Sequence, residues 1–505
     1  MISPRFLRLW IAAFGAAALS QIAANADVRL HTLFTDHMVL QRDISVPVWG
    51  WADEGEEVVV RFRDQTVKTK AKDGHWLVRL SRLKAGGPDV ISVQGKNQIE
   101  LKDVLVGEVW IASGQSNMEW PMSRTFDAQQ EISKTANPQI RLYTVPKLRA
   151  LTPTNNVPSS WTLCQPETVP GFSAVAYYFG RDLQKALGVP VGLIHTSWGG
   201  SPAEVWMSDP VLQNNPRYKA EIVDTYPQSL RSYQDQVADL EKKRAVAKAE
   251  GKEFTQRAPW APWRPSELYN GMIAPLIPYA IKGAIWYQGE SNAGRAEQYR
   301  SLFVDMIRNW RKDWGQGDFG FHLVQLAPFM AIKERPEESN WAELREAQWL
   351  ATKTLPNVGM AVITDVGDPQ DIHPTHKEPV GARLALAAQK VIYGQRIVHS
   401  GPEYRSMKVD GDRIVLKFRN VGAGLVARGG ELRGFAIAGE DKKFVWASAE
   451  ILGNKVVVSS RSVSKPVAVR YAWADDPVVN FWNVDGLPAV PFRTDDFPMI
   501  TAGKK

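Results

Sequence analysis

The stretch VLVGEVWIASGQSNM, residues 104–118, joins a run of apolar residues to a short polar loop. Residues 104–112 carry mostly bulky apolar side chains, as expected of a strand buried on both faces of a parallel sheet. Small residues at positions 113 and 114 let the chain turn sharply, so that Ser116 stands at the start of a following helix. The stretch therefore predicts a strand, loop and helix that present a serine at the edge of an α/β sheet.

Further apolar runs predict the other strands of this sheet. They are Val191–Thr196, Ile281–Tyr287, His322–Ala327 and Val358–Thr364. Segments of helical spacing separate most of them, and the clearest are Arg295–Trp314 and Lys377–Tyr393. Residues 104–400 are therefore expected to form an α/β domain with a parallel five-stranded sheet flanked by helices. The charged helix expected at Ser229–Glu250 and the Pro- and Trp-rich loop after it form an excursion at about residues 210–265.

Segments rich in β-formers flank this domain. Short apolar runs alternate with Gly and Asp turns in residues 27–103 and again in residues 401–505. The pattern predicts an N-terminal and a C-terminal β-sandwich region. Three domains agree with a length of 505 residues, at about 100–200 residues per domain.

The first 26 residues have the form of a signal peptide. Arg5 and Arg8 precede the apolar stretch Leu9–Leu19, and Ala24-Asn25-Ala26 is a small-x-small cleavage site. The apolar stretch is shorter than the ~20 residues that span a bilayer. Residues 1–26 are therefore expected to direct export to the periplasm or the medium, with cleavage before Asp27 and no membrane association afterwards.

Charge and cysteine content exclude several classes of protein. The formal net charge is +7, and removal of Arg5 and Arg8 with the leader reduces it to +5, with no basic run. A charge surplus this small and this dispersed does not indicate nucleic-acid binding. A single cysteine, Cys164, excludes a disulfide framework and a Cys-based zinc site.

Four loops follow predicted strands and carry the candidate chemistry. In a parallel sheet, ligands bind beyond the carboxyl ends of the strands, so these loops should meet at one edge. The loops contain Ser116, the glycine pair Gly199-Gly200, the polar cluster Gln288 to Asn292, and His373. Alone, Ser116 is equally consistent with a turn or helix cap, and the glycines with a plain turn. Together the loops favour a nucleophilic serine with a histidine base.

The same residues resemble a known family. GQSNM at 114–118, WGG at 198–200, WYQGESNA at 286–293 and DIHP at 371–374 resemble the four blocks of the SGNH hydrolase superfamily. The sialate O-acetylesterase branch is the nearest, with acetylxylan esterases next. Further similar runs are MVLQR at 38–42, ELYNGMIAPL at 267–276, ELREAQ at 343–348, YAWADDP at 471–477 and GLPAVPFRTDDFP at 486–498. The resemblance covers nearly the whole mature chain and implies a flavodoxin-like sheet.

The resemblance also implies the roles of single residues. Ser116 is the expected nucleophile and His373 the expected general base. Oxyanion donors are expected to be the Ser116 N–H, a glycine of the WGG loop (Gly200 rather than Gly199), and an amide of the third loop, either Asn292 or Gln288.

The acid that orients the histidine stays open. The superfamily usually has Asp three residues before His, but position 370 is Gln. Asp371 and Glu290 are the two principal candidates, Asp368 and Asp365 are secondary, and a Ser–His dyad without an acid is a further alternative.

The expected activity is removal of acetyl groups from sugar hydroxyls by acyl transfer through Ser116, with no metal or organic cofactor and with activity that survives a chelator. The substrate alternatives are acetylated sialic acid and acetylated plant polysaccharide such as xylan. Trp120, Trp198, Trp206 and Trp286 are candidate sugar-stacking residues. A non-catalytic carbohydrate-binding protein is the alternative class, and a lipase or protease is disfavoured because G-x-S-x-G is missing. The oligomeric state is left open.

Overall fold

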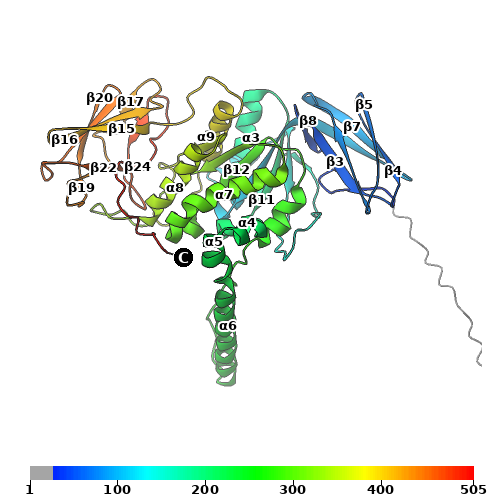
Figure 1. The fold of residues 1–505 in the computed structure, drawn as a ribbon, viewed down its shortest axis with the longest axis horizontal. Helices are drawn as coiled ribbons and strands as arrows, with labels where there is room; N and C mark the ends of the chain where they lie inside the picture. Colours follow the sequence, from blue (N-terminus) through cyan, green and yellow to red (C-terminus); the bar gives the residue numbers. More distant parts are fainter. Residues whose placement is uncertain (1–26, 505) are drawn as a thin grey trace, which may run out of the picture.

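The computed structural model describes residues 27–504. N-terminal sheets, a central α/β region and C-terminal sheets follow one another along the long axis of the molecule (Figure 1). The predicted signal peptide, residues 1–26, lies outside the described residues. Over residues 27–504, no helix has both the length and the apolar character that a membrane crossing requires.

The central sheet contains all five predicted strands. These are β8 (Gln98–Gly114), β11 (Val191–Ser197), β12 (Gly283–Tyr287), β13 (Gly320–Val324) and β14 (Val358–Ala361). They pair in parallel in the order β11-β8-β12-β13-β14. Counted along the chain this order is 2-1-3-4-5, which places the point where the strand order reverses beside β8. The loop that follows β8 therefore lies where a doubly wound sheet binds its ligands.

The sheet extends beyond the five expected strands. β9 (Asn137–Thr144) pairs in parallel with β11, and β10 (Thr162–Cys164) closes the edge antiparallel to β9. The expectation of a five-stranded sheet was therefore too small. β9 begins Asn-Pro-Gln and only its second half is buried, so it lacks the continuous apolar run of a central strand.

Helices cover both faces of the central sheet. α3 (Ala174–Leu187) and α9 (Glu378–Val391) pack against each other on one face, and α7 (Ala296–Trp314) and α8 (Asn340–Thr354) on the other. The six residues of α7 predicted to share a face, Tyr299, Leu302, Phe303, Met306, Ile307 and Trp310, are all buried. The fold is thus mixed α/β, with a parallel-containing central sheet flanked by helices.

One of the two N-terminal sheets is continuous with the central sheet, and the other is separate. One sheet has the antiparallel order β1-β3-β6, with strands Arg29–Leu30, Val46–Trp51 and His75–Leu80. The other joins β2 (Val39–Gln41), β4 (Glu57–Phe62), β5 (Gln65–Lys70) and β7 (Gly86–Gln94) to the first half of β8. β8 has 17 residues and crosses from residue 103 to residue 104, so one strand serves both regions.

The C-terminal region consists of antiparallel sheets around one core. One contains β15 (Glu403–Asp410), β16 (Arg413–Arg419), β20 (Ser448–Leu452) and β21 (Lys455–Ser459). The second contains β18 (Phe435–Ala438), β19 (Val445–Trp446), β22 (Ala468–Tyr471) and β24 (Phe492–Arg493), and β17 (Leu425–Ala427) pairs with β23 (Phe481–Asn483). Side chains from both four-stranded sheets share one apolar cluster.

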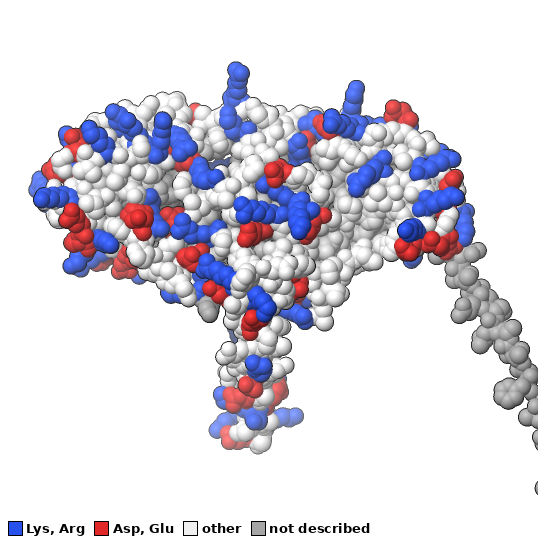
Figure 2. Space-filling view, in the orientation of Figure 1, with Lys and Arg blue, Asp and Glu red and all other residues white. Residues whose placement is uncertain are grey.

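The expected excursion is a helix that projects from the central region (Figure 1). α6 spans Tyr226–Ala249, and Leu240 is its only buried residue. Positive and negative side chains are intermixed over the visible face of the molecule, including this helix (Figure 2). The distribution agrees with the small charge surplus of the sequence.

Candidate active site

Ser116 stands at the carboxyl end of β8, at the first residue of α1 (Ser116–Glu119). Gly114 makes the turn possible: its φ is +136°, and a Cβ there would lie 2.2 Å from the carbonyl oxygen of Tyr287. No larger residue fits without displacing β12. The turn brings the Oγ of Ser116 to 2.8 Å from Nε2 of His373, across 257 residues of sequence. The two residues that sequence analysis paired are therefore in hydrogen-bond contact.

The imidazole of His373 is held on three sides. Its Nδ1 lies 3.3 Å from Oδ1 of Asp371, and the same oxygen accepts the backbone N–H of His373 at 2.8 Å. The ring stacks on Trp120 with centroids 5.3 Å apart and an interplanar angle of 17°. Burial lowers the pKa of His373 and Asp371 partly offsets this effect. The ring is therefore kept neutral and able to accept a proton near neutral pH.

The four carboxylates considered as the acid contact different groups in the structure. Asp371 faces Nδ1 of His373, whereas Glu290 is half-buried and accepts a hydrogen bond from Nδ2 of Asn117 at 2.7 Å. Asp365 forms an ion pair with Arg383, at 2.6 Å. Asp368 accepts the backbone N–H groups of residues 370 and 371. Within residues 27–504, Asp371 is the carboxylate within 4 Å of the imidazole.

Asn117 links the serine loop to the histidine loop. Its Oδ1 accepts a hydrogen bond from Nζ of Lys377 at 2.5 Å, and its Nδ2 donates to the carbonyl of Ile372 at 3.0 Å as well as to Glu290. A buried amide thus connects a carboxylate, an ammonium and the residue before His373. This arrangement fixes the backbone on both sides of the Ser116–His373 contact.

Lys377 was not identified from the sequence as a site residue. It is 1% exposed, and burial lowers its pKa from 10.5 to about 7, while Glu290 and Asp371 act in the opposite direction. Burial likewise raises the pKa of Glu290, against the hydrogen bond from Asn117 and the charge of Lys377. The position of Lys377 at the start of a predicted helix gave no indication that its ammonium group points inward. Asn117 was quoted in a motif but given no role, although its place next to Ser116 was a usable signal.

The glycine loop lies directly against Ser116. A Cβ on Gly199 would come within 3.2 Å of Cβ of Ser116, and the N–H of Gly199 donates to Oε2 of Glu119 at 2.7 Å. Gly200 has φ of +74°, and its carbonyl accepts the indole N–H of Trp263 at 2.8 Å. The N–H of Gly199 is therefore already engaged by Glu119. The N–H of Gly200 is the one in this loop that can donate to a substrate oxyanion.

The two candidate amides of the third loop differ in their free hydrogens. Both hydrogens of Nε2 of Gln288 are engaged, by the Ser201 carbonyl at 3.3 Å and Oδ1 of Asn292 at 2.6 Å. Nδ2 of Asn292 donates to Glu204 at 3.0 Å, which uses one of its two hydrogens. Gln288 therefore has no N–H to offer a substrate, whereas Asn292 has a second one.

The four candidate stacking tryptophans divide into two pairs. Trp206 and Trp286 are completely buried and pack edge to face, so they belong to the core and not to a substrate surface. Their expected role as sugar platforms is therefore corrected. Trp120 stacks on His373, and Trp198 lies in the glycine loop with its ring 5.4 Å from that of Trp263.

Metal ligands are not clustered in the described structure. Over residues 27–504, no three His, Cys, Asp or Glu side chains are grouped as a metal site would require.

A doubly wound α/β fold with a serine–histidine contact at the carboxyl edge of its sheet defines a hydrolase class of protein. Comparison with known proteins narrows this class. Residues 237–390 match the family model of carbohydrate esterase, sialic acid-specific acetylesterase.

Two relatives and one solved structure extend the match over the chain. The chain is 30% identical to the sialate O-acetylesterase of Homo sapiens over 418 residues, which cover 75% of this chain and 74% of the human protein. It is 29% identical to the sialate O-acetylesterase of Mus musculus over 521 residues, with 93% and 95% covered. A carbohydrate acetylesterase from Xanthomonas citri has a similar structure, with 40% identity, a TM-score of 0.81, and 93% of this chain and 100% of that chain covered.

The chain belongs to the sialate O-acetylesterase family of carbohydrate esterases. The protein is accordingly a carbohydrate acetylesterase of the sialate O-acetylesterase type, a carboxylic ester hydrolase. The resemblance identified from the sequence motifs is confirmed.

Proposed function

We propose that the protein removes acetyl groups from sugar hydroxyls by a two-step mechanism in which Ser116 is acylated. The observation that carries the proposal is the 2.8 Å contact between Oγ of Ser116 and Nε2 of His373. His373 accepts the hydroxyl proton as Oγ attacks the acetyl carbonyl carbon. The tetrahedral intermediate then expels the sugar oxygen, which takes the proton from Nε2 and leaves as the free hydroxyl.

The second step returns the enzyme to its starting state. His373 takes a proton from water as the water oxygen attacks the acetyl-Ser116 carbonyl. Collapse of the second intermediate releases acetic acid and restores the Ser116 hydroxyl. The neutral imidazole favoured by burial is the form that accepts the proton of Ser116 in the first step and the proton of water in the second.

The contacts support a choice in each of three assignments that the sequence leaves open. Asp371 orients the imidazole, because its carboxylate faces Nδ1 while Glu290 faces Asn117. The oxyanion donors are the backbone N–H of Ser116, which as the first residue of a helix has no intrahelical acceptor, the N–H of Gly200, and Nδ2 of Asn292.

We also propose a domain organisation and a location for the protein. The strand order and the four loops support an SGNH-type, flavodoxin-like catalytic domain at residues 104–400, between β-sandwich regions at 27–103 and 401–505. The charged and apolar segments of residues 1–26 support export to the periplasm or the medium.

The substrate is proposed to be an acetylated glycan, and two classes remain in competition. Arg149 lies over the rings of Trp198 and Trp263, at 5.4 and 4.1 Å, so a cation stands beside the glycine loop. Such a cation suits the carboxylate of a sialic acid, yet Arg149 already lies 3.7 Å from Glu267. Acetate release from O-acetylated sialic acid and from acetylated xylan, measured side by side, separates the two classes.

The serine assignment is tested by Ser116→Ala with p-nitrophenyl acetate as the substrate. Ser116→Ala is expected to abolish turnover while the far-UV circular dichroism spectrum stays unchanged. Ser229→Ala, an exposed serine of α6, is the matched control and should keep wild-type turnover. Near-normal turnover by Ser116→Ala would refute the proposed nucleophile.

A further inference from the structure

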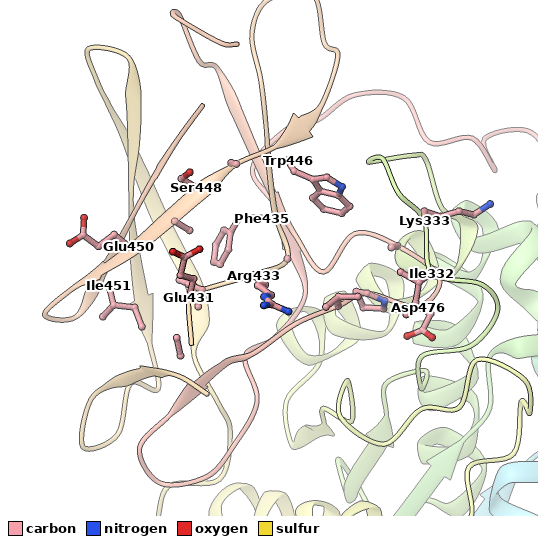
Figure 3. Close-up of a pocket in the computed structure, with 18 residues that line it drawn as sticks. Ile332, Lys333, Glu431, Arg433, Phe435, Trp446, Ser448, Glu450, Ile451 and Asp476 are labelled. Carbon is pink, nitrogen blue, oxygen red and sulfur yellow. The ribbon is translucent and has the colours of Figure 1, made fainter. Parts of the chain in front are cut away.

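A cavity of about 730 Å³ lies between the C-terminal sheets and the loop that follows β13 (Figure 3). β18, β19 and β20 supply one wall, the segment 474–478 after β22 supplies another, and Ile332 and Lys333 of the loop supply the third. Its size falls in the ~300–1,000 Å³ range of pockets that bind small ligands. None of the residues assigned to acyl transfer lines it.

The cavity wall exposes apolar side chains that a folded protein ordinarily covers. Trp446, Ile332 and Val478 are 44%, 57% and 47% exposed. The indole of Trp446 points into the space between the sheets and the loop (Figure 3). An exposed aromatic ring beside a concave surface provides a flat platform for the C–H face of a sugar.

Charged side chains line the same cavity. Within residues 27–504, no hydrogen bond or ion pair engages the charged ends of Glu431, Arg433 and Glu450. Asp476 is half-buried, and burial raises its pKa, as does the charge of Asp368, while the charge of Arg345 acts in the opposite direction. These side chains can bond to ligand hydroxyls without first breaking an ion pair.

The cavity is held in shape by contacts with the central region. Nε1 of Trp446 donates to the carbonyl of Glu334 at 2.8 Å, which fixes the plane of the indole. Buried Arg345 donates to the carbonyls of Ala474 at 2.6 Å and Asp475 at 2.8 Å. The ion pair between Arg470 and Glu338, at 2.8 Å, adds a further tie. A preformed site of this kind loses little entropy when it binds a ligand.

One residue of the cavity wall, Asp476, feels the charge of Asp368, a residue of the loop that contains His373. Asp368, whose charge acts on Asp476, accepts the backbone N–H of Asp371, and Asp371 in turn contacts His373. Asp368 and Asp371 thus link this wall of the cavity to the loop that contains His373.

We propose that this cavity binds a neutral segment of the acetylated glycan, with one sugar ring stacked on Trp446 and its hydroxyls bonded to Arg433, Glu431 and Asp476. The lining carries three carboxylates, on Glu431, Glu450 and Asp476, against two cations, on Lys333 and Arg433. Because carboxylates outnumber cations in the lining, the cavity favours a neutral glycan over an anionic one. It adds a second binding site to the proposed function and does not depend on acyl transfer at Ser116.

The test measures binding by full-length Ser116→Ala, which leaves the acetyl groups in place, using isothermal titration calorimetry with an acetylated xylo-oligosaccharide. Adding Trp446→Ala is expected to weaken binding about tenfold. Arg433→Ala gives a second, independent loss. Trp260→Ala, which removes a 95% exposed tryptophan outside the cavity, is the matched control and should bind normally.

Activity measurements separate this inference from the proposed mechanism. In the otherwise wild-type enzyme, Trp446→Ala should leave turnover of p-nitrophenyl acetate unchanged and raise KM for acetylated xylan. Equal binding with and without Trp446→Ala and Arg433→Ala would overturn the inference, as would binding of a sialylated oligosaccharide in preference to the neutral one. Trp446-dependent binding in a protein that releases no acetate would leave this site standing and reject the proposed esterase mechanism.

Discussion

Replacement of Asp371 by asparagine shows how much a carboxylate at the imidazole contributes. In the transition state His373 carries a positive charge, and Oδ1 of Asp371 lies 3.3 Å from its Nδ1. Coulomb's law gives ~1.3 kcal/mol for unit charges at this separation in water and ~5 kcal/mol at an effective dielectric constant of about 20. The Asp371 side chain is 54% exposed, so solvent screening places the interaction in the lower half of this range.

The expected loss in kcat/KM is therefore about 10- to 100-fold, since each ~1.4 kcal/mol corresponds to a factor of ten. Because Asp371 raises the pKa of His373, Asp371→Asn lowers that pKa. The acid limb of the pH profile of kcat/KM should then move to lower pH. Glu290→Gln should leave the acid limb in place, since the carboxylate of Glu290 faces Asn117.

The assay is hydrolysis of p-nitrophenyl acetate by wild type and both variants across the acid limb. Asp412→Asn, which removes an exposed carboxylate in the C-terminal region, is the control and should match wild type. A shifted acid limb in Glu290→Gln with an unshifted limb in Asp371→Asn would show that the assignment of the acid is wrong.

Two further predictions concern stability. Burial lowers the pKa of Lys377 from 10.5 to about 7, so the unfolded chain is protonated here at pH values where the folded protein is not. Relative to Lys377→Met, the free energy of unfolding of wild type should therefore rise by about 1.4 kcal/mol per pH unit between pH 7 and the unfolded pKa of 10.5. This contribution of Lys377 is present in full above the unfolded pKa and is lost as the pH falls to about 7. Urea unfolding at two pH values within that window checks this, and a constant difference between the two proteins would contradict it. Trp286→Ala should destabilise the protein by about 3–5 kcal/mol because the ring is fully buried against Phe303 and Trp310. The control, Trp260→Ala, should change the free energy of unfolding by less than about 0.5 kcal/mol because that ring is exposed. Similar urea midpoints for the two variants would contradict the packing of Trp286.

The sequence predicted those parts of the fold that depend on local pattern. Strands buried on both faces, such as β11, are continuous apolar runs, and α7 shows its buried face at three- and four-residue steps. The sequence pattern did not predict β9, because the first half of this strand is partly exposed and contains a proline. The contact between Ser116 and His373 was predictable because both follow strands of one parallel sheet, whose carboxyl ends share an edge.

Other parts of the site depend on tertiary placement that no spacing reveals. The amide of Asn117 meets Lys377 and Glu290 only because three loops converge, and a lysine at the start of an amphipathic helix is ordinarily exposed. Trp286 was a candidate sugar platform because it borders the third loop, but strand alternation turns its ring into the core. The cavity beside Trp446 is built from segments of two regions that are far apart in the sequence.

Labelling with a fluorophosphonate measures whether His373 activates Ser116. Peptide mapping by mass spectrometry after partial reaction should find one phosphonylated serine, Ser116, and the labelling rate should fall sharply in His373→Ala. An adduct on a different serine, or an equal rate of labelling at Ser116 in His373→Ala, would show that His373 does not activate Ser116.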